Sequence, residues 1–180
     1  MSKRRKATLI VVCEDKRQKT FAYRFLLGMG WERHQIHFSK MSSGSGSGAK
    51  RVIETYPLEL KIYRSRHVTC ALVVIIDGDE RGVEARMRQL NQECGNFGIP
   101  CRQKEEKVAF IVPTYSIETW IRFLQGYPVN EELNYKEKVH DDECKPSADR
   151  LVEYCKSTVL PNNAPSALRL ACDEYRERIR

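Results

Sequence analysis

Four short runs of apolar, largely β-branched residues alternate with longer amphipathic stretches, and this alternation constrains the fold more than any other feature. The apolar runs cover residues 7–13, 35–38, 71–76 and 108–112. Continuous apolar runs of this length are typical of parallel strands that are covered on both faces. We therefore expect an α/β fold with a mostly parallel, Rossmann-like sheet of about four strands, helices on both faces, and further C-terminal helices.

Amphipathic helices are expected between and after these runs. Apolar residues recur at helical spacing in residues 20–29, 49–64, 80–90, 117–124, 146–156 and 165–179. Ser116 is placed to cap the fourth of these helices, and Pro57 is expected to kink or interrupt the second. Residues 91–107 and 126–142 are polar, so we expect irregular connections there.

The chain length favours one domain of ordinary size with a small appendage. We expect residues 1–125 to form an α/β metal-binding domain and residues 126–180 to form a helical extension packed on it. No apolar run approaches the ~20 residues of a membrane helix. The basic start MSKRRK is not followed by a long apolar segment or a small-residue cleavage site, so we do not expect it to be a secretory signal. The seven cysteines are an odd number that fits a reducing compartment. These features predict a cytoplasmic protein with no membrane contact.

The formal net charge of +7 favours a polyanionic partner, DNA or RNA. Lys50 and Arg51 follow the glycine- and serine-rich segment 41–48, and Arg81 follows an acidic turn. We expect these three residues to contact nucleic acid, with the segment acting as a backbone clamp. It does not match the phosphate-binding pattern G-x-x-x-x-G-K-[ST], because alanine separates the last glycine from Lys50. The sequence leaves a homodimer open.

Acidic residues follow three of the four apolar runs. Glu14 follows the first run, Asp77 and Asp79 follow the third in the stretch ALVVIIDGDERG, and Glu118 opens the helix after the fourth. The carboxyl ends of parallel strands meet at one edge of a sheet, so these side chains are expected to converge. Side chains alternate with period two, which places Asp77 and Asp79 on the same side of an extended strand end.

Carboxylates that converge in this way repel one another unless a cation lies between them. Oxygen ligands without histidine or cysteine suit a hard ion. The sequence therefore predicts a Mg²⁺ or Mn²⁺ site formed by Glu14, Asp77, Asp79 and Glu118.

Each of these acids also has a local structural explanation, and these alternatives stay open at this point. Asp79 can cap the helix expected near residue 80, and Glu118 can pair with Arg122 on the next turn of its helix. Glu14 and Asp15 can stabilise the start of the first helix, because carboxylates interact favourably with helix N-termini.

The arrangement resembles the Toprim domain, the metal-binding fold shared by topoisomerases, primases and OLD-type nucleases. That family carries a glutamate after its first strand and D-x-D, often followed by x-x-G, after its third. Glu14 and the stretch 77–82, DGDERG, occupy these places here. The resemblance covers roughly the first two thirds of the chain, and it departs from many members at Asp15, where they have glycine.

The resemblance implies a Mg²⁺-dependent endonuclease that hydrolyses phosphodiester bonds. Glu118, in SIETW, is similar to an acidic residue that precedes tryptophan in small stand-alone Toprim-like proteins of bacterial anti-phage defence systems. Such proteins often work beside an ABC-type ATPase, which makes an ATPase a candidate partner. A basic residue is expected to assist the four carboxylates at the transition state. We choose Lys145 for this catalytic role because it opens the C-terminal helices; Lys16, Lys104 and Lys107 are other candidates.

Three other function classes are compatible with parts of the pattern. A non-catalytic adaptor would bind nucleic acid or dock on an ATPase without cutting. A receiver-like signalling domain also carries acids after its first and third strands, but it needs a fifth strand followed by lysine. A haloacid-dehalogenase-type phosphatase would place its D-x-D after the first strand.

Overall fold

The computed structural model describes residues 7–40 and 46–179, so residues 41–45 of the predicted clamp segment lie outside the described residues. Within them the chain forms one sheet with the strand order β2-β1-β3-β4, and every neighbouring pair is parallel. The strands are β1 (Thr8–Val12), β2 (Ile36–Phe38), β3 (Cys70–Ile75) and β4 (Val108–Ile111). The predicted α/β class with a parallel sheet of about four strands is confirmed.

The apolar residues of the strands cover both faces of the sheet. Val11, Val73 and Ala109 lie side by side across β1, β3 and β4 and pack against helices on one face. Their neighbours Leu72 and Phe110 point to the opposite face, where they pack against other helices. Because both faces are covered, β1 and β3 need apolar residues at consecutive positions, which explains the continuous runs in the sequence.

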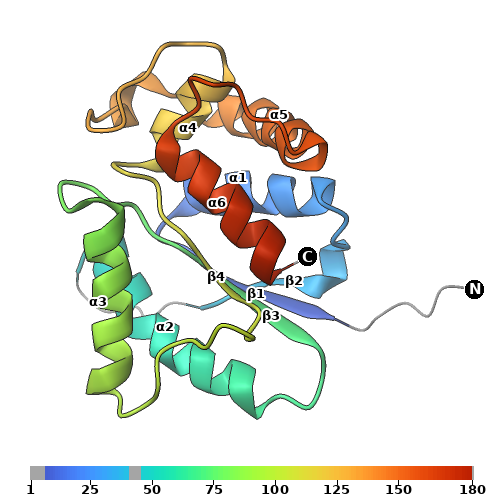
Figure 1. The fold of residues 1–180 in the computed structure, drawn as a ribbon, viewed down its shortest axis with the longest axis vertical. Helices are drawn as coiled ribbons and strands as arrows, with labels where there is room; N and C mark the ends of the chain where they lie inside the picture. The colour runs from blue at the N-terminus through green and yellow to red at the C-terminus, as the bar shows by residue number, and fades with distance from the viewer. Residues whose placement is uncertain (1–6, 41–45, 180) are drawn as a thin grey trace, which may run out of the picture.

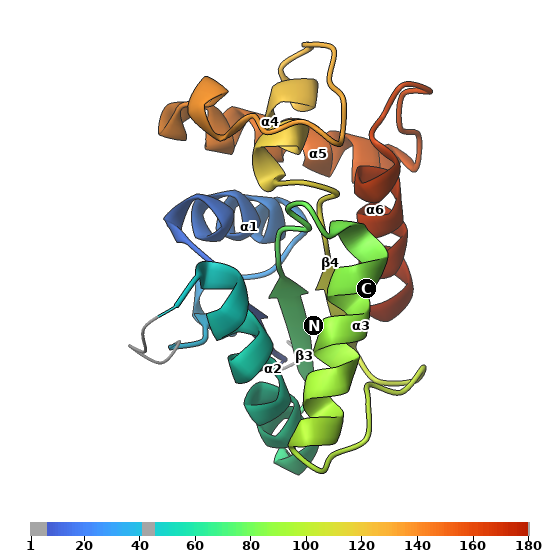
Figure 2. The ribbon, with the colours of Figure 1, turned by 90° about the vertical axis from the view of Figure 1, so that its left-hand side faces the viewer.

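Six α-helices surround this sheet in the described residues. They are α1 (Lys16–Gly28), α2 (Gly48–Ser65), α3 (Gly82–Asn96), α4 (Ile117–Leu124), α5 (Cys144–Ser157) and α6 (Ser166–Arg178). Helices α2 and α3 lie on one face of the sheet, and α1 and α6 lie on the other (Figure 1). The rotated view shows α2 and α3 side by side along β3 (Figure 2). None of these helices combines the length and the apolar character that crossing a bilayer requires.

Helices α4 and α5 form an additional layer over α1 (Figure 1). Trp120 and Ile121 of α4, Leu151 of α5 and Leu168 of α6 share one buried cluster with Phe21 of α1. The C-terminal residues therefore complete the cover of one sheet face, and they bring the segment after α4 towards the start of α1. Short 3-10 turns lie in that segment at η2 (Lys136–Lys138) and η3 (Asp141–Glu143), and a third, η1 (Arg33–Gln35), precedes β2.

Two helix predictions were wrong, one about an interruption and one about where a helix ends. Helix α2 runs through Pro57 without interruption, because Val52, Tyr56 and Leu60 on either side of it are buried against the sheet. Helix α3 continues to Asn96 instead of ending near residue 90, because Cys94 extends its buried stripe by one further turn.

Helix α1 also begins earlier than expected. The side chain of Asp15 accepts a hydrogen bond from the backbone N–H of Gln18 at 2.9 Å, which caps the helix at Lys16 rather than near residue 20. This earlier start places Arg17 and Gln18 in the first turn of α1, beside the carboxyl ends of the strands.

Candidate functional site

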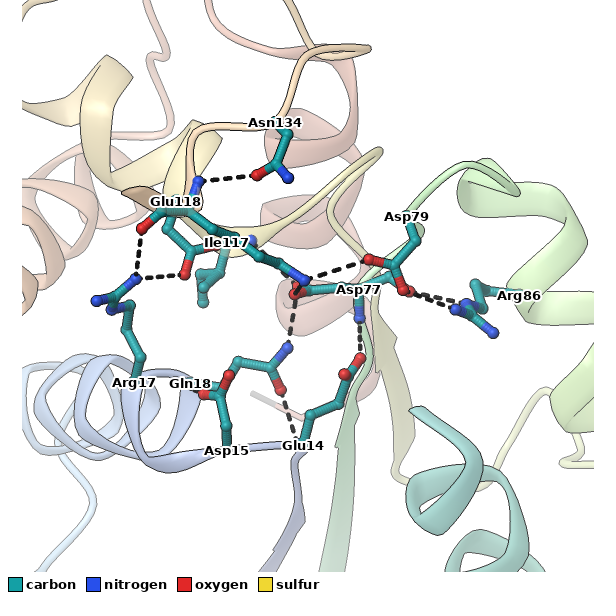
Figure 3. A network of polar contacts seen from close by, with 11 residues as sticks. Glu14, Asp15, Arg17, Gln18, Asp77, Asp79, Arg86, Ile117, Glu118 and Asn134 are labelled. Atoms are coloured by element: carbon teal, nitrogen blue, oxygen red, sulfur yellow. Dashed lines mark hydrogen bonds and ion pairs between the residues drawn. The ribbon is translucent and has the colours of Figure 1, made fainter. Parts of the chain in front are cut away.

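The predicted acidic residues converge at the carboxyl-terminal edge of the sheet (Figure 3). Glu14 lies just beyond β1, Asp77 and Asp79 lie just beyond β3, and Glu118 lies in the first turn of α4. The Oε1 atom of Glu14 accepts a hydrogen bond of 2.6 Å from the backbone N–H of Asp77. Two segments that are far apart in the sequence are thereby joined at the point where their strands end.

Asp77 is the most deeply placed of the four carboxylates, with only 2% of its surface exposed. Its Oδ1 atom accepts hydrogen bonds from the side-chain amide of Gln18 at 2.9 Å and from the backbone N–H of Ile117 at 3.1 Å. Burial raises the pKa of Asp77 well above its usual range, and the nearby carboxylates of Glu14 and Glu118 raise it further. This carboxyl is held in one orientation by α1 and by the N-terminus of α4.

The turn that carries Asp77 and Asp79 fits closely against the chain after β4. The N–H of Gly78 donates to the carbonyl of Pro113 at 2.9 Å, and the N–H of Asp79 donates to the carbonyl of Tyr115 at 2.7 Å. A Cβ atom on Gly78 would lie 2.0 Å from the carbonyl oxygen of Thr114. Only glycine fits between the two aspartates, because the backbone of the neighbouring segment occupies the space of a side chain.

Asp79 leaves the extended conformation that the sequence suggested. Its φ of 50° lies in the left-handed region, which is uncommon for a residue other than glycine. It does not cap α3, whose N-cap is Arg81. Its Oδ2 atom instead pairs with the Nη2 of Arg86 at 2.9 Å, and the Nε of Arg86 donates to the carbonyl of Asp77 at 2.8 Å. The buried Arg86 guanidinium thus holds both ends of the DGD turn.

A lysine from a distant segment supplies the cation between the two aspartates. The Nζ atom of Lys136 lies 3.3 Å from Oδ1 of Asp79 and 3.9 Å from Oδ2 of Asp77. Burial acts to lower the pKa of Lys136, but the carboxylates of Asp77 and Asp79 outweigh it, and the pKa is raised above its usual range. The ammonium group of Lys136 therefore lies between the two aspartates and faces one carboxylate oxygen of each.

Glu118 is paired with Arg17 rather than with Arg122. Its Oε1 atom lies 2.7 Å from Nη1 of Arg17. The guanidinium of Arg122 instead stacks over the ring of Tyr127 at 4.4 Å. The second carboxylate oxygen of Glu118, Oε2, is buried and has no hydrogen-bond partner among the described residues. A buried carboxylate oxygen without a partner is costly, so this atom has room in its hydrogen-bonding capacity for a further donor or cation.

Glu14 is confined by the start of α2 as well as by Asp77. A Cβ atom on Gly48 would lie 2.9 Å from the Cβ of Glu14 and 3.0 Å from its Oε2. Burial raises the pKa of Glu14 from 4.5 to about 7 despite the hydrogen bond from the Asp77 backbone. Gly48 thus allows the start of α2 to approach the acidic edge.

The donor atoms of this cluster suit a hard divalent cation, although they are not gathered around one point. In residues 7–40 and 46–179, no three histidine, cysteine, aspartate or glutamate side chains are grouped closely enough to hold an ion as they stand. The carboxylates instead pair with Lys136, Arg86 and Arg17. The unpartnered Oε2 of Glu118 and the two aspartate oxygens that face Lys136 are carboxylate oxygens, the type of donor that Mg²⁺ and Mn²⁺ prefer.

The basic residues predicted from the sequence take different places. Arg81 is exposed and lines a surface hollow with Asp79 and Tyr115, next to the acidic cluster. Lys50, in the first turn of α2, is exposed and pairs with Glu54 at 3.7 Å, and Arg51 follows it in the same helix. Lys145 is exposed at the start of α5 and lines a separate groove beside α1.

Four residues of the cluster were not identified from the sequence: Arg17, Gln18, Arg86 and Lys136. The spacing Asp15-x-x-Gln18 is that of a helix-capping box, and it was a usable signal for the start of α1 and for the position of Gln18. Arg86 and Lys136 had no comparable signal, because arginine in a helix and lysine in a polar connection are common on any surface.

No protein-family model, curated protein or solved structure matches this chain in sequence or in fold. The geometry of the cluster is therefore what bears on the function of the chain.

Proposed function

We propose that this protein is a metal-dependent nuclease that hydrolyses phosphodiester bonds of nucleic acid. The observation that carries the proposal is the position of the Lys136 ammonium ion between Oδ2 of Asp77 and Oδ1 of Asp79. There, two carboxylates hold the positively charged end of a lysine side chain. They do so at the carboxyl edge of a parallel sheet, where α/β proteins bind their ligands. Mg²⁺ or Mn²⁺ has the charge and the oxygen preference to take that position.

The residues around the aspartates prepare them for such a role. Gln18 and the N–H of Ile117 occupy Oδ1 of Asp77, which leaves its Oδ2 directed at the cation position. Arg86 in turn holds Oδ2 of Asp79 and leaves its Oδ1 directed there. Partners that orient the ligands of a metal in this way strengthen its binding.

When bound, the metal would supply the charge that activates a water molecule and stabilises the phosphate. Glu14, held by the backbone of Asp77, and Oε2 of Glu118 are the remaining carboxylate ligands in this proposal. Lys136, rather than Lys145, is the cation placed to contact the substrate phosphate once it leaves the aspartates. Arg81 is exposed beside Asp79 and is a second phosphate contact.

The resemblance to Toprim domains supports the same reaction. The glycine of D-G-D is required here, because the backbone of Thr114 approaches it too closely for any side chain. The glycine of the motif therefore has a structural role at this site. A role as the effector of an anti-phage defence system, with an ABC-type ATPase as partner and with a cytoplasmic location, is part of the proposal on the strength of that resemblance alone.

A cleavage assay with paired variants tests the proposed activity. We expect the purified protein to cleave labelled DNA or RNA with Mg²⁺ or Mn²⁺, and Asp79→Asn to lower the rate at least about 100-fold, because it removes a ligand charge. Glu105→Gln, which removes the same charge from an exposed residue before β4, is the matched control and should retain the wild-type rate. Equal rates for wild type and Asp79→Asn would show that the cleavage does not come from this cluster.

A second function, that of a non-catalytic adaptor, is favoured by one observation. Asp77, Asp79 and Glu118 are already paired with cations of the chain itself, as the acids of a purely structural network would be. An adaptor of this kind would bind nucleic acid or an ATPase without binding a metal ion. Absence of both metal binding and cleavage in folded protein would favour it.

A further inference from the structure

A groove on the side of α1 is separate from the acidic cluster and has a different chemistry. It has a volume of about 660 Å³ and lies between α1, the turn η1, β2 and the start of α5. This volume falls within the range of about 300–1,000 Å³ that is usual for ligand-binding clefts. We call it the α1 groove.

The α1 groove is strongly basic. Five cationic side chains line it and no carboxylate does; they are Lys16, Lys19, Arg24, Arg33 and Lys145. Arg24 is held by both oxygens of Asp149, at 2.7 and 2.9 Å. The other four cations form no ion pair with any residue in the described part of the chain. Four uncompensated positive charges around one groove favour a polyanionic occupant.

Two aromatic rings lie among these charges. The partly exposed rings of Tyr23 and Phe38 are 6.2 Å apart and tilted by 56°, and both line the groove. The Nζ of Lys19 lies 5.0 Å from the centre of the Phe38 ring. Cations that can contact phosphates, interleaved with rings that can stack on bases, are the features of sites for single-stranded nucleic acid. The paired bases of a duplex cannot reach such rings.

The groove begins next to the proposed metal site. Lys16 lies between the capping residue Asp15 and Arg17, which pairs with Glu118. On the side of the groove formed by α5, Lys145 follows the turn η3. Asp141 of that turn pairs with the same Arg17 at 3.1 Å. A strand that runs along the groove would therefore reach the acidic cluster over the first turn of α1.

We propose that the α1 groove binds single-stranded nucleic acid, with phosphates on Lys16, Lys19 and Lys145 and a base stacked on Tyr23. The choice of nucleic acid among polyanions rests on the proposed function. The assignment gives Lys145 a role in substrate binding instead of the catalytic role expected from the sequence. It also specifies the substrate as single-stranded.

Binding can be measured without cleavage by fluorescence anisotropy in EDTA, with a labelled single-stranded oligonucleotide and the duplex of the same length. We expect the single strand to bind more tightly than the duplex. The triple variant Lys16→Ala/Lys19→Ala/Lys145→Ala should bind it at least about tenfold more weakly. The slope of log K against log salt should fall by about 2, because each phosphate contact to a single strand contributes about 0.7. Tyr23→Leu should weaken binding about fivefold or more through lost stacking.

The matched control is Lys61→Ala/Arg88→Ala/Lys156→Ala, which removes the same charge from exposed positions outside the groove. It should bind within about twofold of wild type, with an unchanged salt slope. Equal losses in the two triple variants, a preference for the duplex, or wild-type binding by Tyr23→Leu would each overturn the proposal. Because the assay contains no metal, loss of cleavage with intact groove binding would refute the nuclease alone, and intact cleavage without groove binding would refute the groove alone.

Discussion

At the scale of single residues, Glu14 is held in a position that disfavours its charge. It is largely buried beside Asp77, and its pKa is raised from 4.5 to about 7. The unfolded chain ionises Glu14 near its ordinary pKa, whereas the metal-free folded protein keeps the proton until near neutral pH. The stability associated with the protonated carboxyl is therefore fully present below pH 4.5 and is lost as the pH rises through 7.

Replacing Glu14 with glutamine should remove this pH dependence. As the pH rises from 5 to 8 in EDTA, the free energy of unfolding of Glu14→Gln should increase by about 1–3 kcal/mol relative to that of wild type. The amide oxygen can still accept the hydrogen bond from the Asp77 backbone. Urea unfolding at several pH values measures the difference, and the exposed Glu105→Gln should show no such trend. A pH-independent difference for Glu14→Gln would contradict the raised pKa of Glu14.

At the scale of elements, the site depends on how closely the ends of β3 and β4 approach each other. The backbone hydrogen bonds from Gly78 to Pro113 and from Asp79 to Tyr115 continue the pairing of the two strands into the loops. This continuation brings the N–H of Ile117 to within 3.1 Å of Oδ1 of Asp77, so that the aspartate takes over the capping role expected of Ser116. The position of the carboxylate is thus set by the contact between two loops.

Gly78→Ala should separate these loops, because the new methyl group would meet the Thr114 carbonyl at 2.0 Å. We expect a loss of about 1–3 kcal/mol in the free energy of unfolding, the usual cost of overpacking. Gly95→Ala in α3 is the control, since a Cβ atom there has nothing within 4 Å and alanine favours a helix. Urea unfolding of both variants provides the comparison, and a Gly78→Ala protein as stable as Gly95→Ala would refute the proposed tight approach.

At the scale of the whole molecule, the segment between α4 and α5 closes the site. The first part of this segment is held by Glu131. Its carboxylate accepts hydrogen bonds from the hydroxyl of Thr114, at 2.9 Å, and from the backbone N–H of Ala167 at the start of α6, at 3.0 Å. Arg17 fixes the second part of the segment through the carbonyl of Lys136, at 3.2 Å, and through Asp141. The Lys136 side chain is held over the aspartates between these two attachments.

Removing the Lys136 charge should strengthen metal binding, because an ammonium ion and a divalent cation cannot share the same two carboxylate oxygens. We expect Lys136→Met to bind Mn²⁺ about tenfold more tightly than wild type in calorimetry, which corresponds to about 1.4 kcal/mol. Lys138→Met, a neighbouring exposed lysine in the same 3-10 turn, should leave the affinity unchanged. Unchanged or weaker binding by Lys136→Met would show that the lysine does not occupy the place of the ion.

The sequence by itself determined the parallel α/β sheet and the edge at which the acids collect. Both follow from local features: continuous apolar runs form buried strands, and a residue directly after a parallel strand lies at its carboxyl edge. The tertiary structure alone decided which cation each acid faces. Lys136 lies 57 residues from Asp79, and Arg17 lies 101 residues from Glu118. Electrostatic pairing depends on distance in space, and that distance is set only when α4, α5 and the segment between them pack over α1.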